Sequence, residues 1–233
     1  MSLLQTKVKV LELFAGSRSF TKVAMEHGCK TYTTDIEPFE GIDQVCDIFD
    51  FDVDLAEKSL GGCPDIIWAS PPCTYFSVAS MGYHWNKNGT PKTKQAEFGI
   101  SLIKQTKKII EYFKNLNKEL FYIIENPRGK LRKLNLLDSM NIHTVTYCQY
   151  GDKRMKPTDL WSNIELKLKP MCKNGDDCHE SAPRGSRTGT QGLKNPFERS
   201  KVPAKLCFDV LRFAIDNQYK NNYTKESFYD TSK

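Results

Sequence analysis

Apolar runs alternate with helix-like repeats along most of the chain. Short apolar or alternating runs bounded by turn residues predict strands at 7–14, 30–35, 43–47, 65–70 and 120–127. Apolar residues at helical spacing predict helices at 19–27, at 95–117 and after Pro203. Strands that alternate with helices predict an α/β fold, in which a mostly parallel sheet has helices on both faces.

The composition and the hydrophobic pattern change in the last third of the chain. Residues 164–198 are rich in Lys, Gly, Pro, Asp and Ser and show little periodicity, so we expect a small loop-rich insert without a core of its own. Around it we expect a core at 1–163, a helix at 199–220 that returns to this core, and a polar tail at 221–233.

Composition narrows the class of protein. With 233 residues, 39% of them hydrophobic, the chain suits one globular domain. It has no apolar run of membrane-spanning length and its start lacks a signal-peptide pattern, so we expect a monomeric cytoplasmic protein without a membrane partner. A reducing compartment would keep its eight cysteines free for catalysis or metal binding. The formal charge of +6 suits a polyanionic partner.

Residues that can carry chemistry stand where predicted strands end. Asp35, Cys73 and Glu125 are examples, and the Phe14-Ala15-Gly16 turn would let a cofactor approach the backbone. Cys73 follows two prolines that hold its backbone. A thiolate can add to an electron-poor ring while a carboxylic acid binds a ring nitrogen. Taken singly, each of these residues fits a structural role equally well.

Six motifs, in this order, resemble those of the cytosine-5 DNA methyltransferase family. They are 11–16 (LELFAG), Asp35, 46–48 (CDI), 69–77 (ASPPCTYFS), 125–127 (ENP) and 147–151 (YCQYG) with the basic residues that follow it. The resemblance implies a Rossmann-like fold that binds S-adenosylmethionine, and an enzyme that methylates cytosine in double-stranded DNA. It also implies that Cys73 adds to carbon 6 of a flipped base while Glu125 binds or protonates ring nitrogen 3.

The same resemblance implies the site residues. Catalytic roles go to Cys73, Glu125, Arg154 and Lys156. Cofactor contacts go to Phe14, Ala15, Gly16, Asp35, Ile36, Asp47, Ile48, Pro71 and Ser200. Nucleic-acid contacts are expected from Ser77 and Lys87. Arg184 and Arg187 could also bind phosphates, because basic residues are spaced by Gly, Ser and Thr there, with a solvated basic loop as the alternative. Residues 74–95 are expected to form a mobile loop that closes over the base.

The chain departs from the family pattern at three places. The basic motif has Arg154, Lys156 and Thr158 where the family has a glutamine and two arginines. Residues 199–201 (RSK) replace a Gly-Asn pair, so a cofactor variant with extra negative charge stays an alternative to ordinary S-adenosylmethionine. The target-recognition region has shrunk to the insert, which indicates short or relaxed specificity and a compact, phage-type enzyme. An RNA methyltransferase and a catalytically silent binding module are the competing hypotheses.

The insert also contains a candidate metal site. Cys172, Cys178 and His179 could bind zinc, with Cys148 as a fourth ligand, and a segment without a core would gain stability from such a link. The spacing differs from that of paired zinc knuckles, so free surface thiols are the alternative.

Overall fold

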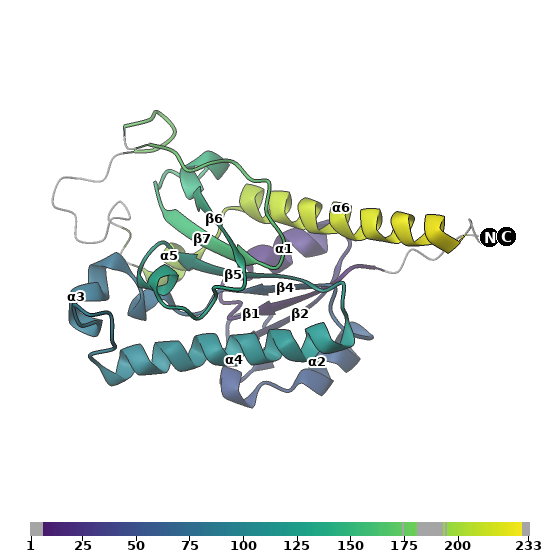
Figure 1. The fold of residues 1–233 in the computed structure, drawn as a ribbon, viewed down its shortest axis with the longest axis horizontal. Coiled ribbons are helices and arrows are strands. Elements are labelled where there is room, and N and C mark those ends of the chain that lie inside the picture. Colours follow the sequence, from purple (N-terminus) through teal and green to yellow (C-terminus); the bar gives the residue numbers. More distant parts are fainter. Residues whose placement is uncertain (1–6, 174, 181–192, 194, 230–233) are drawn as a thin grey trace.

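The computed structural model describes residues 7–173, 175–180, 193 and 195–229, with side chains described up to residue 217. Its central element is a seven-stranded sheet (Figure 1). In chain order the strands are β1 (Lys9–Leu13), β2 (Lys30–Asp35), β3 (Gln44–Val45), β4 (Ile66–Ala69), β5 (Phe121–Pro127), β6 (Asn141–Thr146) and β7 (Pro157–Ser162).

The strand order is β3-β2-β1-β4-β5-β7-β6. β1 to β5 pair in parallel, β7 pairs antiparallel with β5, and β6 pairs antiparallel with β7. The order turns back at β1, with β2 on one side and β4 on the other, and such switch points are where open α/β sheets bind ligands. The predicted fold, a mostly parallel Rossmann-like sheet, is therefore confirmed.

Helices cover both faces of this sheet. In chain order they are α1 (Ser19–Glu26), α2 (Val53–Leu60), α3 (Met81–His84), α4 (Lys94–Leu116), α5 (Pro196–Ser200) and α6 (Ala204–Tyr229). α2 and α4 lie on one face, and α1 and α6 lie on the other (Figure 1).

Side-chain alternation along the strands builds the two cores. On β1, Leu11 and Leu13 join the core under α2 and α4, whereas Val10 joins the core under α1 and α6. Neighbouring β4 repeats the division, with Ile67 on the first face and Trp68 on the second. Because both faces of the parallel strands are buried, these strands read in the sequence as nearly continuous apolar runs.

Several elements differ from the predictions. The pattern did not predict α2 or the β6–β7 pair. In that pair Thr144 and the buried Asp159 form a hydrogen-bond network with Arg132, which precedes β6, instead of an apolar stripe. α6 continues past residue 220 to Tyr229, where we expected a polar tail, because residues 217–229 contain neither glycine nor proline to end it. None of the helices in the described part of the chain has the length and apolar character needed to cross a membrane.

Candidate active site

The turn after β1 is built around a strained backbone. Phe14 has a φ of 57° and Gly16 a φ of 45°, which is the left-handed region that side chains disfavour. The Gly16 amide donates a hydrogen bond of 2.8 Å to Asp35 Oδ2 at the end of β2. Below the turn, the carboxylate of Glu12 accepts hydrogen bonds from the amides of Thr21 (2.7 Å) and Phe20 (3.4 Å) in the first turn of α1. These bonds hold the turn open toward the space beside β4.

Cys73 lies beyond the end of β4, at the start of a short 3₁₀ helix, Cys73–Tyr75. The two residues before it are prolines, and the carbonyl of Pro71 accepts a 2.8 Å hydrogen bond from Nδ2 of the buried Asn126. After Cys73, the carbonyl of Phe76 accepts a 2.7 Å bond from the amide of Lys130. The loop that carries the thiol is thus fixed on both sides, by the end of β5 and by the segment that follows it.

Glu125 lies in β5, and only 5% of it is exposed. The hydroxyl of Tyr147 donates a 2.9 Å hydrogen bond to Glu125 Oε1. Burial, and then the Glu125 charge, raise the pKa of Tyr147 well above its usual value, so this phenol stays protonated and acts as the donor. Tyr147 therefore fixes the orientation of the Glu125 carboxyl group.

The groups around Cys73 have opposite effects on the pKa of its thiol. Burial raises the pKa of its thiol, and Glu125 adds to this rise, while the nearby Lys156 ammonium and Arg199 guanidinium lower it. Lys156 is itself held by a 3.1 Å hydrogen bond from Nζ to the Arg199 carbonyl and lies over the Tyr147 ring. A cation thus favours the thiolate form, which is the nucleophile.

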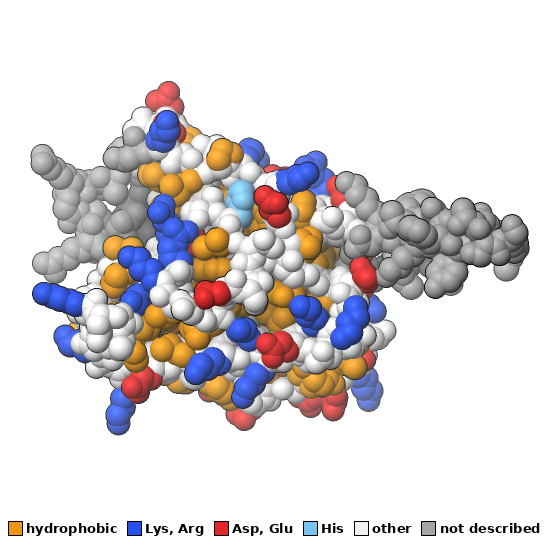
Figure 2. Space-filling model, viewed as in Figure 1, with side chains coloured by type: hydrophobic (Ala, Val, Ile, Leu, Met, Phe, Trp, Pro, Cys, Tyr) orange, Lys and Arg blue, Asp and Glu red, His pale blue; other side chains and the backbone are white. Residues whose placement is uncertain are grey.

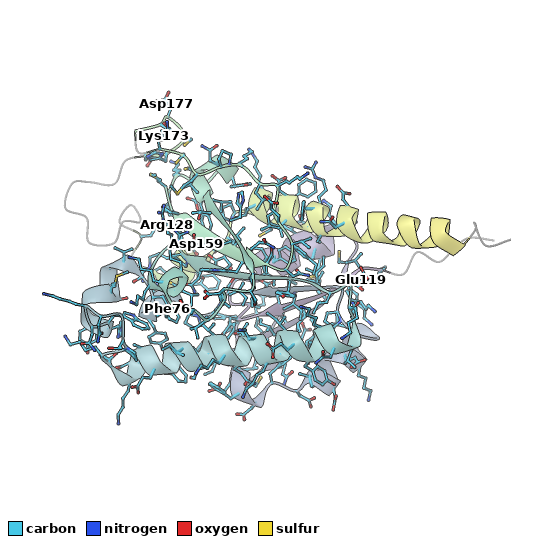
Figure 3. All side chains as sticks on the ribbon, in the orientation of Figure 1. Phe76, Glu119, Arg128, Asp159, Lys173 and Asp177 are labelled. Carbon is cyan, nitrogen blue, oxygen red and sulfur yellow. The ribbon has the colours of Figure 1, made fainter. Side chains whose placement is uncertain are left out.

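A cavity of about 760 Å³ joins these groups. Nine of the predicted site residues line it: Phe14, Ala15, Gly16, Pro71, Cys73, Ser77, Glu125, Lys156 and Ser200. Figure 3 shows Phe76, Arg128 and Asp159 at this end of the sheet, whereas Glu119, which precedes β5, lies at the other. The cavity thus lies beyond the carboxyl ends of the parallel strands, where the sequence placed the site.

The other predicted cofactor residues do not line the cavity. Asp35 bonds the Gly16 amide, and the side chain of Ile36 is 62% exposed. Asp47 Oδ1 accepts a 3.1 Å bond from the Phe49 amide. Ile48 is buried in the core beside α4 and is not on the surface of the site.

Arg154 is held differently from our expectation. It is only 6% exposed, and Nε donates 2.9 Å hydrogen bonds to both carboxylate oxygens of Asp152. The guanidinium also reaches the carbonyls of Arg199 (3.3 Å) and Lys201 (3.4 Å). Because these acceptors occupy its donors and it does not line the cavity, Arg154 connects two backbone segments, and Lys156 is the cation of this motif that faces the thiol.

The segment expected as a loop over the base has structure of its own. It contains the 3₁₀ helix Val78–Ser80 and α3, and Trp85 is buried and donates a 2.7 Å hydrogen bond to the Tyr75 carbonyl. Ser77 lines the cavity, whereas Lys87 is exposed in a turn away from it. The predicted contacts Arg184 and Arg187 lie outside the described residues.

Basic side chains lie on and near the cavity. Arg128, Lys156 and Arg199 line it. Figure 2 shows a run of Lys and Arg side chains across the side of this face that carries α3. Such a surface suits the phosphates of a polyanion.

Three residues of the site were not assigned from the sequence: Glu12, Arg128 and Tyr147. The sequence could have indicated Glu12, because an acidic residue inside a buried apolar strand needs a hydrogen-bonding partner or a function. Arg128 follows the ENP motif directly, and Tyr147 opens the YCQYG motif. Their roles depend on a pairing between β5 and the segment after β6, which the sequence pattern did not predict.

The four predicted metal ligands are also brought together. Cys148, Cys172, Cys178 and His179 place one ligand atom each within 4.8 Å of the others. This cluster lies outside the cavity described above.

Comparisons with known proteins found relatives by sequence and by structure. The chain is 28% identical over 222 residues to a protein of Frog virus 3 (isolate Goorha) named a probable DNA (cytosine-5)-methyltransferase, and the match covers 88% of this chain and 99% of the viral protein. Two solved structures are similar. The S. pombe Dnmt2 methyltransferase has a TM-score of 0.43 and 13% identity, with 70% of this chain and 52% of that chain covered. A mutant DNMT2 of Spodoptera frugiperda has a TM-score of 0.42 and 15% identity, with 74% and 56% covered, so this chain spans about half the length of either solved chain. No family model matches the chain.

Proposed function

We propose that this chain is a cytosine-5 methyltransferase, which transfers a methyl group from S-adenosylmethionine to carbon 5 of cytosine in DNA. One observation carries the proposal. Cys73 and Glu125 line the same cavity as the Phe14–Gly16 turn, so a nucleophile, an acid and a cofactor-sized space lie together.

The turn after β1 fits the proposed cofactor. Gly16, which has a left-handed backbone and no side chain, lines the cavity together with Phe14 and Ala15. Asp35, at the end of β2, keeps Oδ1 and Oδ2 beside this turn, where an acid accepts ribose hydroxyls in nucleotide-binding sheets. When bound, the cofactor would supply an electrophilic methyl group on sulfonium.

The residues of the cavity account for activation of the base. Carbon 5 of cytosine is a poor nucleophile, so the Cys73 thiolate forms a bond to carbon 6 and shifts an electron pair toward carbon 5. Glu125, oriented by Tyr147, binds or protonates ring nitrogen 3 and stabilises the charge that develops there. Carbon 5 would then take the methyl group as the sulfur–methyl bond of the cofactor breaks and its electron pair stays on sulfur. A base removes the carbon-5 proton, the double bond between carbons 5 and 6 re-forms, and the thiolate leaves with its electron pair.

A stacked base cannot reach this thiol, so the target nucleotide must rotate out of the helix into the cavity. The two 3₁₀ helices that follow Cys73 border the cavity through Thr74, Ser77 and Ser80. Trp85 and Tyr75 anchor this segment from outside, so we expect it to close as a unit over the base.

DNA is the proposed target because the motifs that carry the resemblance are those of DNA methyltransferases, and because basic residues line the cavity mouth. The viral relative carries DNA in its name, which supports the same choice. An RNA target uses the same cysteine chemistry, so the experiment below includes it.

The test is incubation of the purified protein with methyl-labelled S-adenosylmethionine and either duplex DNA or transfer RNA. We expect label in DNA, as 5-methylcytosine after digestion, and none with Cys73→Ala. Label in RNA alone would refute the DNA target while retaining the chemistry. A group other than methyl on carbon 5 would refute the proposed cofactor.

A further inference from the structure

Four side chains with metal-binding atoms meet where the insert crosses the 3₁₀ helix Tyr147–Tyr150. Cys148 comes from that helix, whereas Cys172, Cys178 and His179 come from the insert. Cys148 and Cys172 are separated by 24 positions in sequence, yet their sulfur atoms lie 3.2 Å apart. Both residues are buried, with 6% and 5% of their surfaces exposed. Chain proximity alone therefore does not explain the cluster.

The distances in the cluster suit a shared ion. Cys148 Sγ lies 3.2 Å from Cys172 Sγ and 3.5 Å from Cys178 Sγ, and His179 Nδ1 lies 3.8 Å and 3.5 Å from the sulfurs of Cys172 and Cys178. Tetrahedral zinc separates two thiolate sulfurs by about 3.8 Å, and a sulfur and an imidazole nitrogen by about 3.6 Å. A disulfide would require about 2.05 Å. The sulfurs are thus unbonded and nearly at the separation of zinc ligands.

Two polar features of the cluster bear on metal binding. Gln149 Nε2 donates a 3.5 Å hydrogen bond to Cys178 Sγ, and such a donor stabilises a thiolate. Among the described residues, the buried Nε2 of His179 has no hydrogen-bond partner, so its only polar neighbours at hydrogen-bond range are the sulfurs around Nδ1. Nδ1 of the imidazole therefore lies on the side of the three sulfurs, where it can serve as a fourth ligand atom.

Three hydrogen bonds attach the described part of the insert close to this cluster. Lys169 donates from its amide to the Tyr150 hydroxyl (2.9 Å) and from Nζ to the Gln149 carbonyl (3.1 Å), and the Cys172 amide donates to Thr146 Oγ1 (3.0 Å). Leu166 is buried against the main core, but the stretch from 167 to 171 is largely exposed. A metal link would supply the support that a small core cannot.

We propose that Cys148, Cys172, Cys178 and His179 form a structural zinc site that fastens the insert to the Tyr147–Tyr150 helix. Four protein ligands leave no open position, which is the pattern of structural and not of catalytic zinc. Binding changes no oxidation state, because zinc replaces the thiol protons, which pass to the solvent. Tyr147, the neighbour of Cys148, bonds Glu125, so the metal would also hold the insert beside the catalytic carboxyl group.

The test measures metal in protein purified under reducing conditions, and it needs no methyltransferase activity. Elemental analysis should find one zinc per chain in the wild type. Cys178→Ser and His179→Gln should lower the zinc content about tenfold or more. Cys63→Ser is the matched control, since Cys63 lies far from the cluster and contacts Glu57. Cobalt substitution should give the absorption of a tetrahedral thiolate site in the wild type and in the control only.

A second measurement covers variants that fail to fold. In the wild type, alkylation followed by peptide mass analysis should show Cys148, Cys172 and Cys178 protected until a chelator is added, and reactive afterwards. Wild-type protein that neither contains zinc nor takes up zinc or cobalt after reduction would overturn the proposal. A Cys148–Cys172 disulfide in protein alkylated at lysis would overturn it as well.

Discussion

The side-chain amide of Asn126 in β5 donates a hydrogen bond to the Pro71 carbonyl. We predict that this bond holds the loop that carries Cys73, here called the nucleophile loop, in its catalytic position. Asn126 is fully buried, and its Nδ2 lies 2.8 Å from the Pro71 oxygen, two residues before Cys73. Asn126→Ala removes the donor and leaves a buried carbonyl unpaired. Asn126→Asp keeps the shape but places a carboxylate oxygen against that carbonyl.

The expected cost to stability follows from the burial. Leaving a buried polar group without its partner costs about 1–3 kcal/mol, so the free energy of unfolding should fall by about that amount in Asn126→Ala. The loop also loses the bond that fixes the direction of Cys73, and a displacement of about 1 Å at a reacting group costs up to about 100-fold in rate. We therefore expect kcat to fall about 10- to 100-fold, with the affinity for S-adenosylmethionine nearly unchanged.

Asn163, which follows β7, provides the matched control because it bonds the backbone at the other end of β5. Its Nδ2 donates to the Leu120 carbonyl (2.9 Å) and its Oδ1 accepts from the Tyr122 amide (3.1 Å), so Asn163→Ala loses comparable bonds far from Cys73. Urea unfolding should show similar losses of stability in the two alanine variants, while steady-state kinetics should show the fall in kcat only for Asn126→Ala. Equal kcat values in the two variants would refute the coupling.

Three further changes test other contacts. Gly129→Ala would place a Cβ 2.3 Å from the Phe76 carbonyl, so we expect it to displace the nucleophile loop and to cost about 1–3 kcal/mol in urea unfolding; an unchanged midpoint would contradict this packing. Lys156→Gln removes the cation that lowers the pKa of Cys73, so the pH profile of adduct formation should move to higher pH, whereas Lys153→Gln, at an exposed pair with Glu180, should leave it in place. Burial raises the pKa of Glu12 to about 7, so the folded state binds the proton more tightly than the unfolded one, and wild-type stability should fall as pH rises from about 4.5 to about 7 by roughly 2–3 kcal/mol; in Glu12→Gln, denaturant titrations across that range should lose most of this slope.

Much of the parallel half of the fold could be predicted from the sequence. β1, β4 and β5 are buried on both faces, so each appears as an apolar run that ends at a turn or a proline. α4 shows the helical spacing of Leu102, Ile103, Thr106, Ile109 and Ile110, all buried as that spacing requires. The resemblance to cytosine-5 methyltransferases, based on six motifs, is supported by the 28% identity to the viral protein named a probable DNA (cytosine-5)-methyltransferase.

The parts that were not predicted depend on tertiary contacts. β7 carries the buried Asp159, whose partner Arg132 lies in another element, so the strand lacks the apolar signature. The position of Arg154 depends on Asp152 and on carbonyls near α5, a contact of high sequence separation. The sequence of the basic motif therefore predicts that the segment is positively charged, but it does not predict where each side chain points.

The most direct test of the central claim is covalent trapping with duplex DNA that carries 5-fluorocytosine, in the presence of S-adenosylmethionine. Fluorine at carbon 5 cannot leave as a proton does, so the enzyme should stay bound through the thiol. Peptide mass analysis should then locate the adduct on Cys73 in the wild type and find none in Cys73→Ser. An adduct of equal yield in Cys73→Ser, or one on another cysteine of the wild type, would contradict the role of Cys73 as the nucleophile.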